Sequence, residues 1–222
     1  MLRKVLTNSF TFLKKKSPKT HYSTMSFRNN VSKPSGSKMI NIQAEKIVWM
    51  DLEMTGLNVD KDKIMEIACL ITDSNLNIIA ESQDIIINHS EKTLNEMNEW
   101  CKNQHGRTGL TQACLNSKIS LEKAEVTILN FLKEHVEAKS SPLAGNSVYM
   151  DRFFLYKHMP QVNDYLHYRI VDVSTIKELC QRWNKVLYEN IPKKEFTHRA
   201  LNDIKESVNE LKYYKEQFFN IC

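Results

Sequence analysis

The chain has 222 residues, of which 41% are hydrophobic and 26% are charged, and it has no run of eighteen apolar residues, so its composition is that of a globular protein and excludes a transmembrane helix. Five scattered cysteines without a C-x-x-C pair argue against a disulfide framework and a structural zinc site, and no glycine-rich nucleotide-binding motif occurs. The formal charge of +5 is uneven, because residues 1–44 hold nine of the 31 basic and none of the 26 acidic residues, which leaves a net charge of 22 − 26 = −4 on the rest.

This mildly acidic remainder argues against a groove for long duplex nucleic acid. Residues 1–44, by contrast, are basic and rich in Ser, Thr and Asn, a composition typical of a mitochondrial transit peptide. A secretory signal and a disordered basic tail are the alternatives. We expect a mitochondrial matrix protein with one domain over residues 45–222, and a cytosolic form if Met25 or Met39 serves as a second start.

Three strands are expected after this leader. A short apolar run over residues 47–50 suits a buried strand, and residues 64–72 and 78–87 are two further strand-like runs. Residues 73–75 between the last two, Asp-Ser-Asn, have the composition of a turn. The three runs therefore predict a meander that opens a sheet.

Strands and helices alternate in the rest of the chain. With Ser120 as a plausible N-cap, one helix is predicted from the spacing of Leu121, Ala124, Ile128, Leu132 and Val136. A strand over 142–145 leads into a helix from about Met150, and a strand over 168–173 precedes a helix over 174–183. A final helix is predicted from Leu201, Ile204, Val208, Leu211 and Phe218. Three strands followed by this alternation predict an α/β sandwich.

Carboxylates stand where these predicted elements begin or end. Asp51 and Glu53 follow the first strand two residues apart, so they face the same way and repel each other unless a cation lies between them. Asp151 begins a helix and Asp203 lies in the last helix. Five helical residues rotate by about 140°, so His198 is expected in the entry turn of that helix. Taken singly, these residues are better explained as an exposed acidic pair, a helix-dipole partner and a surface or capping histidine.

Taken together, the pattern D-x-E … D … H-x4-D resembles the DEDDh exonucleases and, within them, the oligoribonuclease family. The residues that carry the resemblance are IVWMDLEMTGL (47–57), SPLAGNSVYMDRFFLYKHMP (141–160), HYRIVDVSTIKELC (167–180) and THRALNDIKESVNELKYY (197–214). It extends from about Lys46 to Phe219. Asn202 and residues 188–195 depart from the family pattern, but none of them is a catalytic position.

The resemblance implies an RNase H-like mixed five-stranded sheet in a single domain with helices on both sides. It implies a homodimeric, metal-dependent 3′-to-5′ exoribonuclease that degrades short single-stranded RNA, especially dinucleotides, to mononucleotides. Two Mg²⁺ or Mn²⁺ ions would be held by four carboxylates, those of Asp51, Glu53, Asp151 and Asp203. Asp51 would bridge the ions, and His198 would be the general base.

The resemblance also implies how a short substrate is bound. Leu57 would wedge against a base, and Trp100 and His105 would stack on and hold the 3′ nucleotide. Ser147 would meet the 5′ phosphate, and three residues of the other subunit would complete this cap: Tyr168, Arg169 and Ser174. The alternatives are that Trp100 packs in the core, that Arg169 forms a surface ion pair and that Ser174 only caps its helix.

Two other functions remain open at this point. The same catalytic centre suits a DEDDh exonuclease that acts on DNA or on longer RNA ends. A protein of this fold without catalysis, which binds RNA or serves as a scaffold, is the third reading. A missing carboxylate would favour this third reading, and none of the four is missing.

Overall fold

The computed structural model describes residues 45–194 and 198–219. The predicted transit peptide and the two alternative starts lie outside the described residues. Within the described ranges, no helix has the length and apolarity that a membrane crossing requires.

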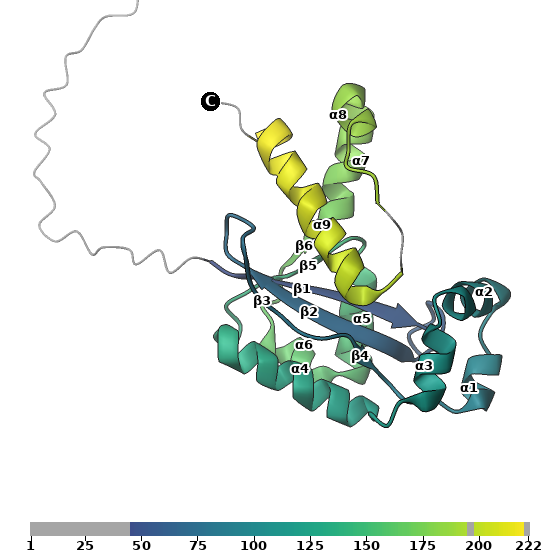
Figure 1. Cartoon of the computed structure of the whole chain (residues 1–222). Coiled ribbons are helices and arrows are strands. Elements are labelled where there is room, and N and C mark those ends of the chain that lie inside the picture. Colours follow the sequence, from purple (N-terminus) through teal and green to yellow (C-terminus); the bar gives the residue numbers. More distant parts are fainter. Residues whose placement is uncertain (1–44, 195–197, 220–222) are drawn as a thin grey trace, which may run out of the picture. The chain divides into compact units, whose positions relative to one another are not determined.

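The centre of the fold is a mixed sheet of six strands (Figure 1). The strands are β1 (Ile47–Met54), β2 (Ile64–Thr72), β3 (Ile78–Glu81), β4 (Ile85–Ile86), β5 (Leu143–Gly145) and β6 (Ile170–Asp172). Five of them follow the order β3-β2-β1-β5-β6, and β4 pairs with β2. β1, β2 and β3 are antiparallel neighbours, whereas β5 runs parallel to β1 and β6 runs parallel to β5. This is the predicted meander followed by parallel strands, with one short strand more than the five expected.

The helices lie between and after these strands. They are α1 (Glu91–Asn95), α2 (Glu99–Arg107), α3 (Leu110–Asn116), α4 (Leu121–His135), α5 (Tyr149–His158), α6 (Pro160–Tyr165), α7 (Val173–Trp183), α8 (Lys185–Glu189) and α9 (Ala200–Tyr214), with a π-helical turn η1 (Lys215–Phe219). The expected N-cap of α4 is present, since the Ser120 hydroxyl accepts a hydrogen bond from the Lys123 amide. The segment with α1, α2 and α3 was not predicted.

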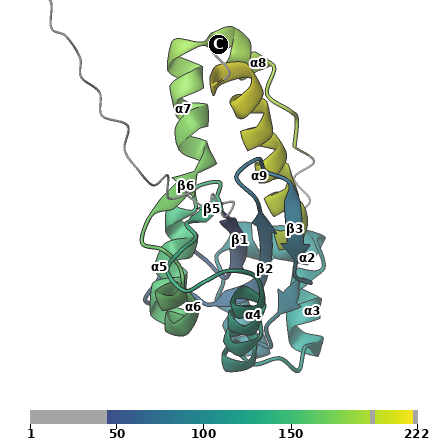
Figure 2. The same cartoon turned by 90° about the vertical axis from the view of Figure 1, so that its left-hand side faces the viewer.

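The two faces of the sheet pack against different helices (Figure 2). Along β1, Val48 and Leu52 pack in one core with residues of α4 and α5, whereas Trp49 packs in a second core with α7 and α9. Alternate residues of a strand point to opposite faces. The odd-numbered Asp51 and Glu53 therefore lie on the same face of the sheet as α9.

Two strand boundaries differ from the sequence-based expectation. β1 continues past the apolar run through Met54, because β2 pairs with it along its whole length. The expected strand over 78–87 is interrupted, and Asp84 in the interruption accepts a hydrogen bond from the Leu201 amide of α9. Asp51 and Glu53 are thus held inside a paired strand, whose backbone fixes their direction.

Candidate active site

Four carboxylates come from three elements that meet at the end of β1. Asp51 and Glu53 belong to β1, Asp151 lies in the first turn of α5, and Asp203 lies in the first turn of α9. The Leu52 amide donates a hydrogen bond of 2.9 Å to Asp151 Oδ1, which ties the start of α5 to β1. The predicted quartet is therefore brought together by β1 and the first turns of two helices.

Burial raises the pKa of all four carboxyl groups, and repulsion by other members of the quartet raises the pKa of Asp51 and Glu53 further. Desolvation, followed by repulsion from Asp203, raises the pKa of Glu53 to about 8. Desolvation also raises the pKa of Asp151 to about 7, against the opposing effect of its backbone hydrogen bonds. For Asp51 the causes are desolvation and then repulsion by Asp151, and for Asp203 desolvation. Without a cation, the cluster therefore retains protons near neutral pH.

The donor atoms fit a divalent metal ion. One ligand atom from each of Glu53, His198 and Asp203 lies within 4.8 Å of the others. Asp203 Oδ1 is buried and has no hydrogen-bond partner, an arrangement that a cation would satisfy. Carboxylate oxygens are the ligands that Mg²⁺ and Mn²⁺ prefer. The donor atoms of this site are therefore those of an acidic metal-binding site.

His198 lies directly before α9, as its spacing from Asp203 predicted. Its backbone φ of 50° is in the left-handed region, which non-glycine residues adopt rarely. The next residue, Arg199, anchors this turn with hydrogen bonds of 2.9 and 3.1 Å to Glu66 Oε1 on β2. Glu66 is fully buried and pairs in register with Glu53. The ion pair between Arg199 and Glu66 therefore connects the turn that contains His198 to β2, at the residue that lies opposite Glu53 of β1.

Sequence reasoning missed this pair, although a signal was present. Glu66 is the one charged residue in IMEIACLIT, the nine-residue segment of β2, and every other residue there is apolar or a threonine. A charge inside a buried strand requires a partner. The pattern does not reveal that the partner is Arg199, because 133 residues separate the two.

Three residues were expected to contact the bases or the 3′ nucleotide: Leu57, Trp100 and His105. Trp100 on α2 is 65% exposed, so it does not pack in the core, and its ring lies edge-on to His198 at 6.5 Å. Leu57 is 68% exposed in the loop that follows β1. His105 is buried, with Nε2 bonded to the Met54 carbonyl at 2.9 Å and Nδ1 3.9 Å from Glu53. Two exposed apolar side chains beside an acidic centre suit the stacking of bases.

A recess of about 370 Å³ contains both Ser147 and Ser174. The Ser147 amide donates a hydrogen bond of 2.9 Å to Ser174 Oγ, and the two hydroxyl oxygens lie 3.3 Å apart. The expectation that Ser174 reaches Ser147 from the other subunit is therefore wrong. Parallel pairing of Gly145 with Asp172 brings the start of α7 beside the residues that follow β5 in the same chain.

Tyr168 and Arg169 lie elsewhere. Both are exposed and precede β6, with the Arg169 guanidinium 5.5 Å from the centre of the Tyr168 ring. Because β5 and β6 are parallel, these two residues lie at the opposite strand end from Ser147. Tyr168 lines a separate recess together with Arg152. Within one chain, Tyr168 and Arg169 therefore lie at the end of β6 that is farther from the serine recess.

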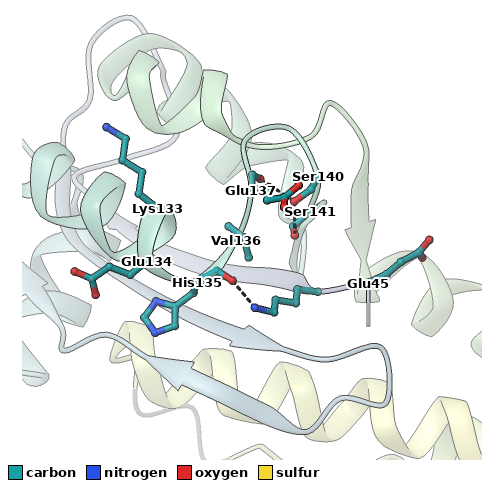
Figure 3. Close-up of a pocket in the computed structure, with 9 residues that line it drawn as sticks. Glu45, Lys133, Glu134, His135, Val136, Glu137, Ser140 and Ser141 are labelled. Carbon is teal, nitrogen blue, oxygen red and sulfur yellow. Dashed lines mark hydrogen bonds between the residues drawn. The ribbon is translucent and has the colours of Figure 1, made fainter. Parts of the chain in front are cut away.

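Another recess, of about 330 Å³, lies where β1 begins (Figure 3). Lys46, which precedes β1, donates a hydrogen bond there to the carbonyl of His135 at the end of α4. At about 3.3 Å per strand residue, Lys46 is roughly 23 Å along the chain from Glu53. None of the predicted site residues lines this recess, so it is not part of the acidic centre.

Comparisons with known proteins agree with this geometry. A family model described as an exonuclease, RNase_T, matches residues 48–211. The chain is 53% identical to a probable oligoribonuclease of Drosophila melanogaster, over 78% of this chain and 82% of that one. It is 52% identical to the mitochondrial oligoribonuclease of Mus musculus, over 79% and 74% of the two chains. It is also 52% identical to an oligoribonuclease of Francisella tularensis subsp. novicida, over 80% and 98%.

Solved structures show the same fold at low identity. The zinc-bound complex of E. coli exonuclease I with single-stranded DNA matches with a TM-score of 0.61 and 15% identity, over 80% of this chain and 42% of that one. Exonuclease I from Methylocaldum szegediense matches with a TM-score of 0.58 and 15% identity, over 79% and 41%. The chain thus spans about two fifths of these structures, and the RNase H-like fold is what they share. With the match to the exonuclease model and the identity to curated relatives, the chain belongs to the oligoribonuclease family of exonucleases.

Proposed function

We propose that this chain is a metal-dependent 3′-to-5′ exoribonuclease that degrades short oligoribonucleotides, above all dinucleotides, to mononucleotides. One observation carries the proposal. A carboxylate quartet, buried at Asp151 and partly buried at the other three residues, has His198 at its edge and the exposed side chains of Leu57 and Trp100 nearby. The acidic centre suits phosphodiester hydrolysis, and the apolar side chains suit the bases next to the bond that breaks.

Asp51, Glu53, Asp151 and Asp203 would hold two cations, Mg²⁺ or Mn²⁺. When bound, such ions supply Lewis-acid activation of the attacking water and stabilise the leaving oxygen. His198 takes a proton from that water as general base. Water adds to the phosphorus of the last linkage and the 3′ oxygen of the preceding nucleotide leaves, so the product is a nucleoside 5′-monophosphate.

Side chains around the centre orient the substrate. Leu57 stands in a rigid loop, because Asp62 accepts hydrogen bonds from the Thr55 hydroxyl and the Asn58 amide. A Cβ on Gly56 would lie 2.4 Å from Asp62 Oδ2, so a larger residue would displace the carboxylate that holds this loop. A fixed Leu57 separates two bases, while Trp100 stacks on the 3′ base.

We also propose a homodimer, in which Tyr168 and Arg169 of one subunit act at Ser147 of the other. α5 exposes aromatic residues at helical spacing: Tyr149 is 49%, Phe153 54% and Tyr156 72% exposed. Tyr149 lines the same recess as Ser147, so this stripe begins at the proposed 5′-phosphate site. A second copy seated on the stripe would bury it and close the recess, which limits the length of RNA that fits.

Location in the mitochondrial matrix is part of the proposal. It is supported by the basic, acid-free composition of residues 1–44 and by relatives from mouse and human that are named mitochondrial. The alternative function is that of an exonuclease for DNA or longer RNA. The similarity to exonuclease I is consistent with it, but that similarity concerns the fold alone.

A length series of end-labelled RNAs, from two to twenty nucleotides, with and without Mg²⁺ tests the function. We expect rapid, Mg²⁺-dependent loss of the dinucleotide and slower loss of longer chains. Equal rates at all lengths, or faster cleavage of single-stranded DNA, would favour the alternative.

Mixed subunits test the shared cap. We expect Arg169→Ala and Asp51→Asn each to lose dinucleotide cleavage. In a mixed dimer, the site that keeps Asp51 borrows an intact Arg169 from the other subunit, so mixing restores activity. No rescue after proven subunit exchange would mean that each chain works with its own residues.

A further inference from the structure

A chain of hydrogen bonds connects the serine recess to the catalytic helix through one side chain, that of Asn146. Asn146 Oδ1 accepts a hydrogen bond of 3.1 Å from Ser174 Oγ. On its other side, Asn146 Nδ2 donates a hydrogen bond of 2.7 Å to Ser207 Oγ on α9. Ser207 in turn donates a hydrogen bond of 2.8 Å to the carbonyl oxygen of Asp203. None of the sequence patterns singled out Asn146 or Ser207.

The direction of each hydrogen bond in this series, from the Ser147 amide to the Asp203 carbonyl, is determined. A carbonyl oxygen only accepts, so the single hydroxyl proton of Ser207 is used at Asp203. Ser207 Oγ must then accept from Asn146, which assigns Nδ2 to the α9 side and Oδ1 to the recess side. The proton of Ser174 is consequently used at Asn146 Oδ1. Ser174 Oγ therefore accepts the hydrogen bond from the Ser147 amide.

Two properties of the recess follow from these assignments of donors and acceptors. Ser174 has no proton left for a ligand, so Ser147 Oγ is the donor of the 3.3 Å hydroxyl pair. Ser147 is therefore the hydroxyl that can turn its proton from Ser174 Oγ to a phosphate oxygen. The backbone of Ser147 has a φ of 51°, and its amide is held by Ser174 Oγ and by Asp172 Oδ1 at 3.0 Å. Of the two bonds that hold the Ser147 turn in this rare conformation, the one to Ser174 depends on Asn146.

Only a side chain with a donor and an acceptor on one short planar group fits this position. An aspartate of nearly the same shape would place an acceptor where Nδ2 now meets Ser207. It would also place a negative charge next to Glu210, a fully buried carboxylate whose Oε2 lies 3.4 Å from Asn146 Nδ2. Aspartate is therefore the substitution that removes the donor with the least change in volume.

We infer that Asn146 is a positioning residue that sets substrate specificity: it orients Ser147 to bind a terminal 5′ phosphate and connects that turn to the backbone of Asp203. The inference rests on the proposed function, since it needs a 5′-phosphorylated RNA bound at Ser147. It adds a residue that touches neither the substrate nor a cation, and it assigns the donated proton to one of the two serines.

The test compares 5′-phosphorylated with 5′-hydroxyl dinucleotides in steady-state kinetics of the full chain with Mg²⁺. A charge-assisted hydrogen bond contributes about ten- to a hundredfold in affinity. We expect Asn146→Asp to reduce the ratio of kcat/KM for the two substrates by about tenfold or more, mainly through a higher KM for the phosphorylated one. Ser207→Ala breaks the same chain further along and should reduce the ratio too, whereas Ser207→Thr, which keeps the hydroxyl, should restore it.

Asn88→Asp is the matched control. Asn88 is an asparagine near α3 whose Nδ2 also donates two hydrogen bonds, to the carbonyls of Cys114 and Ser117. Its substitution should leave the ratio at the wild-type value. A wild-type ratio in folded Asn146→Asp, or in Ser207→Ala if the first variant does not fold, would overturn the inference alone. A ratio near one in the wild-type enzyme would instead refute the proposed 5′-phosphate site, and this inference with it.

Discussion

Replacing Glu53 by glutamine should stabilise the metal-free protein while it abolishes activity. Desolvation first, and then the neighbouring carboxylates, raise the pKa of Glu53 from 4.5 to about 8 in the folded chain. The folded state therefore holds this proton more tightly than the unfolded state does. The stability that the proton provides is complete below pH 4.5 and is lost as the pH rises towards 8.

The size of the effect follows from these two pKa values. At 1.36 kcal/mol per pKa unit, the folded protein has lost about 3 kcal/mol of stability at pH 7, because the unfolded chain ionises Glu53 while the folded chain retains its proton; the loss at pH 5 is less than about 1 kcal/mol. Glutamine has nearly the same shape and no charge, so the variant avoids this loss. For a domain of this size, about 3 kcal/mol corresponds to a rise in Tm of roughly 6–12 °C.

Calorimetric melting in the presence of a chelator at pH 5 and pH 7 measures this difference. Glu96→Gln serves as the control, because Glu96 is exposed in the turn after α1 and its neutralisation should hardly change the Tm. Adding Mn²⁺ should raise the Tm of the wild type at pH 7 and raise that of Glu53→Gln much less. An unchanged or lower Tm of metal-free Glu53→Gln at pH 7 would refute the raised pKa of Glu53 on which this reasoning rests.

His198→Ala should lower kcat by about 10²–10⁴ and keep Mn²⁺ affinity in calorimetric titration, because His198 is proposed to move a proton; lost affinity would make it a ligand. Arg199→Met should reduce the free energy of unfolding by about 3–5 kcal/mol, since it leaves the buried carboxylate of Glu66 unpaired, and the double variant with Glu66→Leu should regain most of this in urea melts. Deleting residues 1–38 should leave a folded, active enzyme by circular dichroism and RNA cleavage, and a fluorescent fusion of residues 1–44 should reach mitochondria; a diffuse cytosolic signal would contradict the targeting role.

Elements with a strong local pattern were predictable from the sequence. The run at 64–72 became β2 with the predicted bounds, and the helix after Ser120 begins with the predicted cap. These predictions succeed because apolar periodicity and capping involve residues that are close in sequence. The segment with α1, α2 and α3 lacks such periodicity. Its helices are short and are stabilised by a small core in which Leu94, Cys101 and Leu110 pack against Met65 of β2.

The chemistry of the site was also in the sequence, as residue types at given spacings. Two carboxylates two residues apart on a strand share a face wherever the strand lies, so Asp51 and Glu53 were paired before any fold was known. The five-residue spacing likewise placed His198 outside the helix of Asp203, where it is found. Resemblance of the flanking segments to one family then supplied the roles.

Only the tertiary structure decided which residues far apart in the chain touch each other and in which environment. It placed Ser174 beside Ser147 of the same chain, paired Arg199 with Glu66, and inserted Asn146 between the recess and α9. It also raised the pKa of the four carboxyl groups above their usual values. Desolvation and repulsion depend on distances in space and on the exclusion of water, and the order of residues along a chain specifies neither.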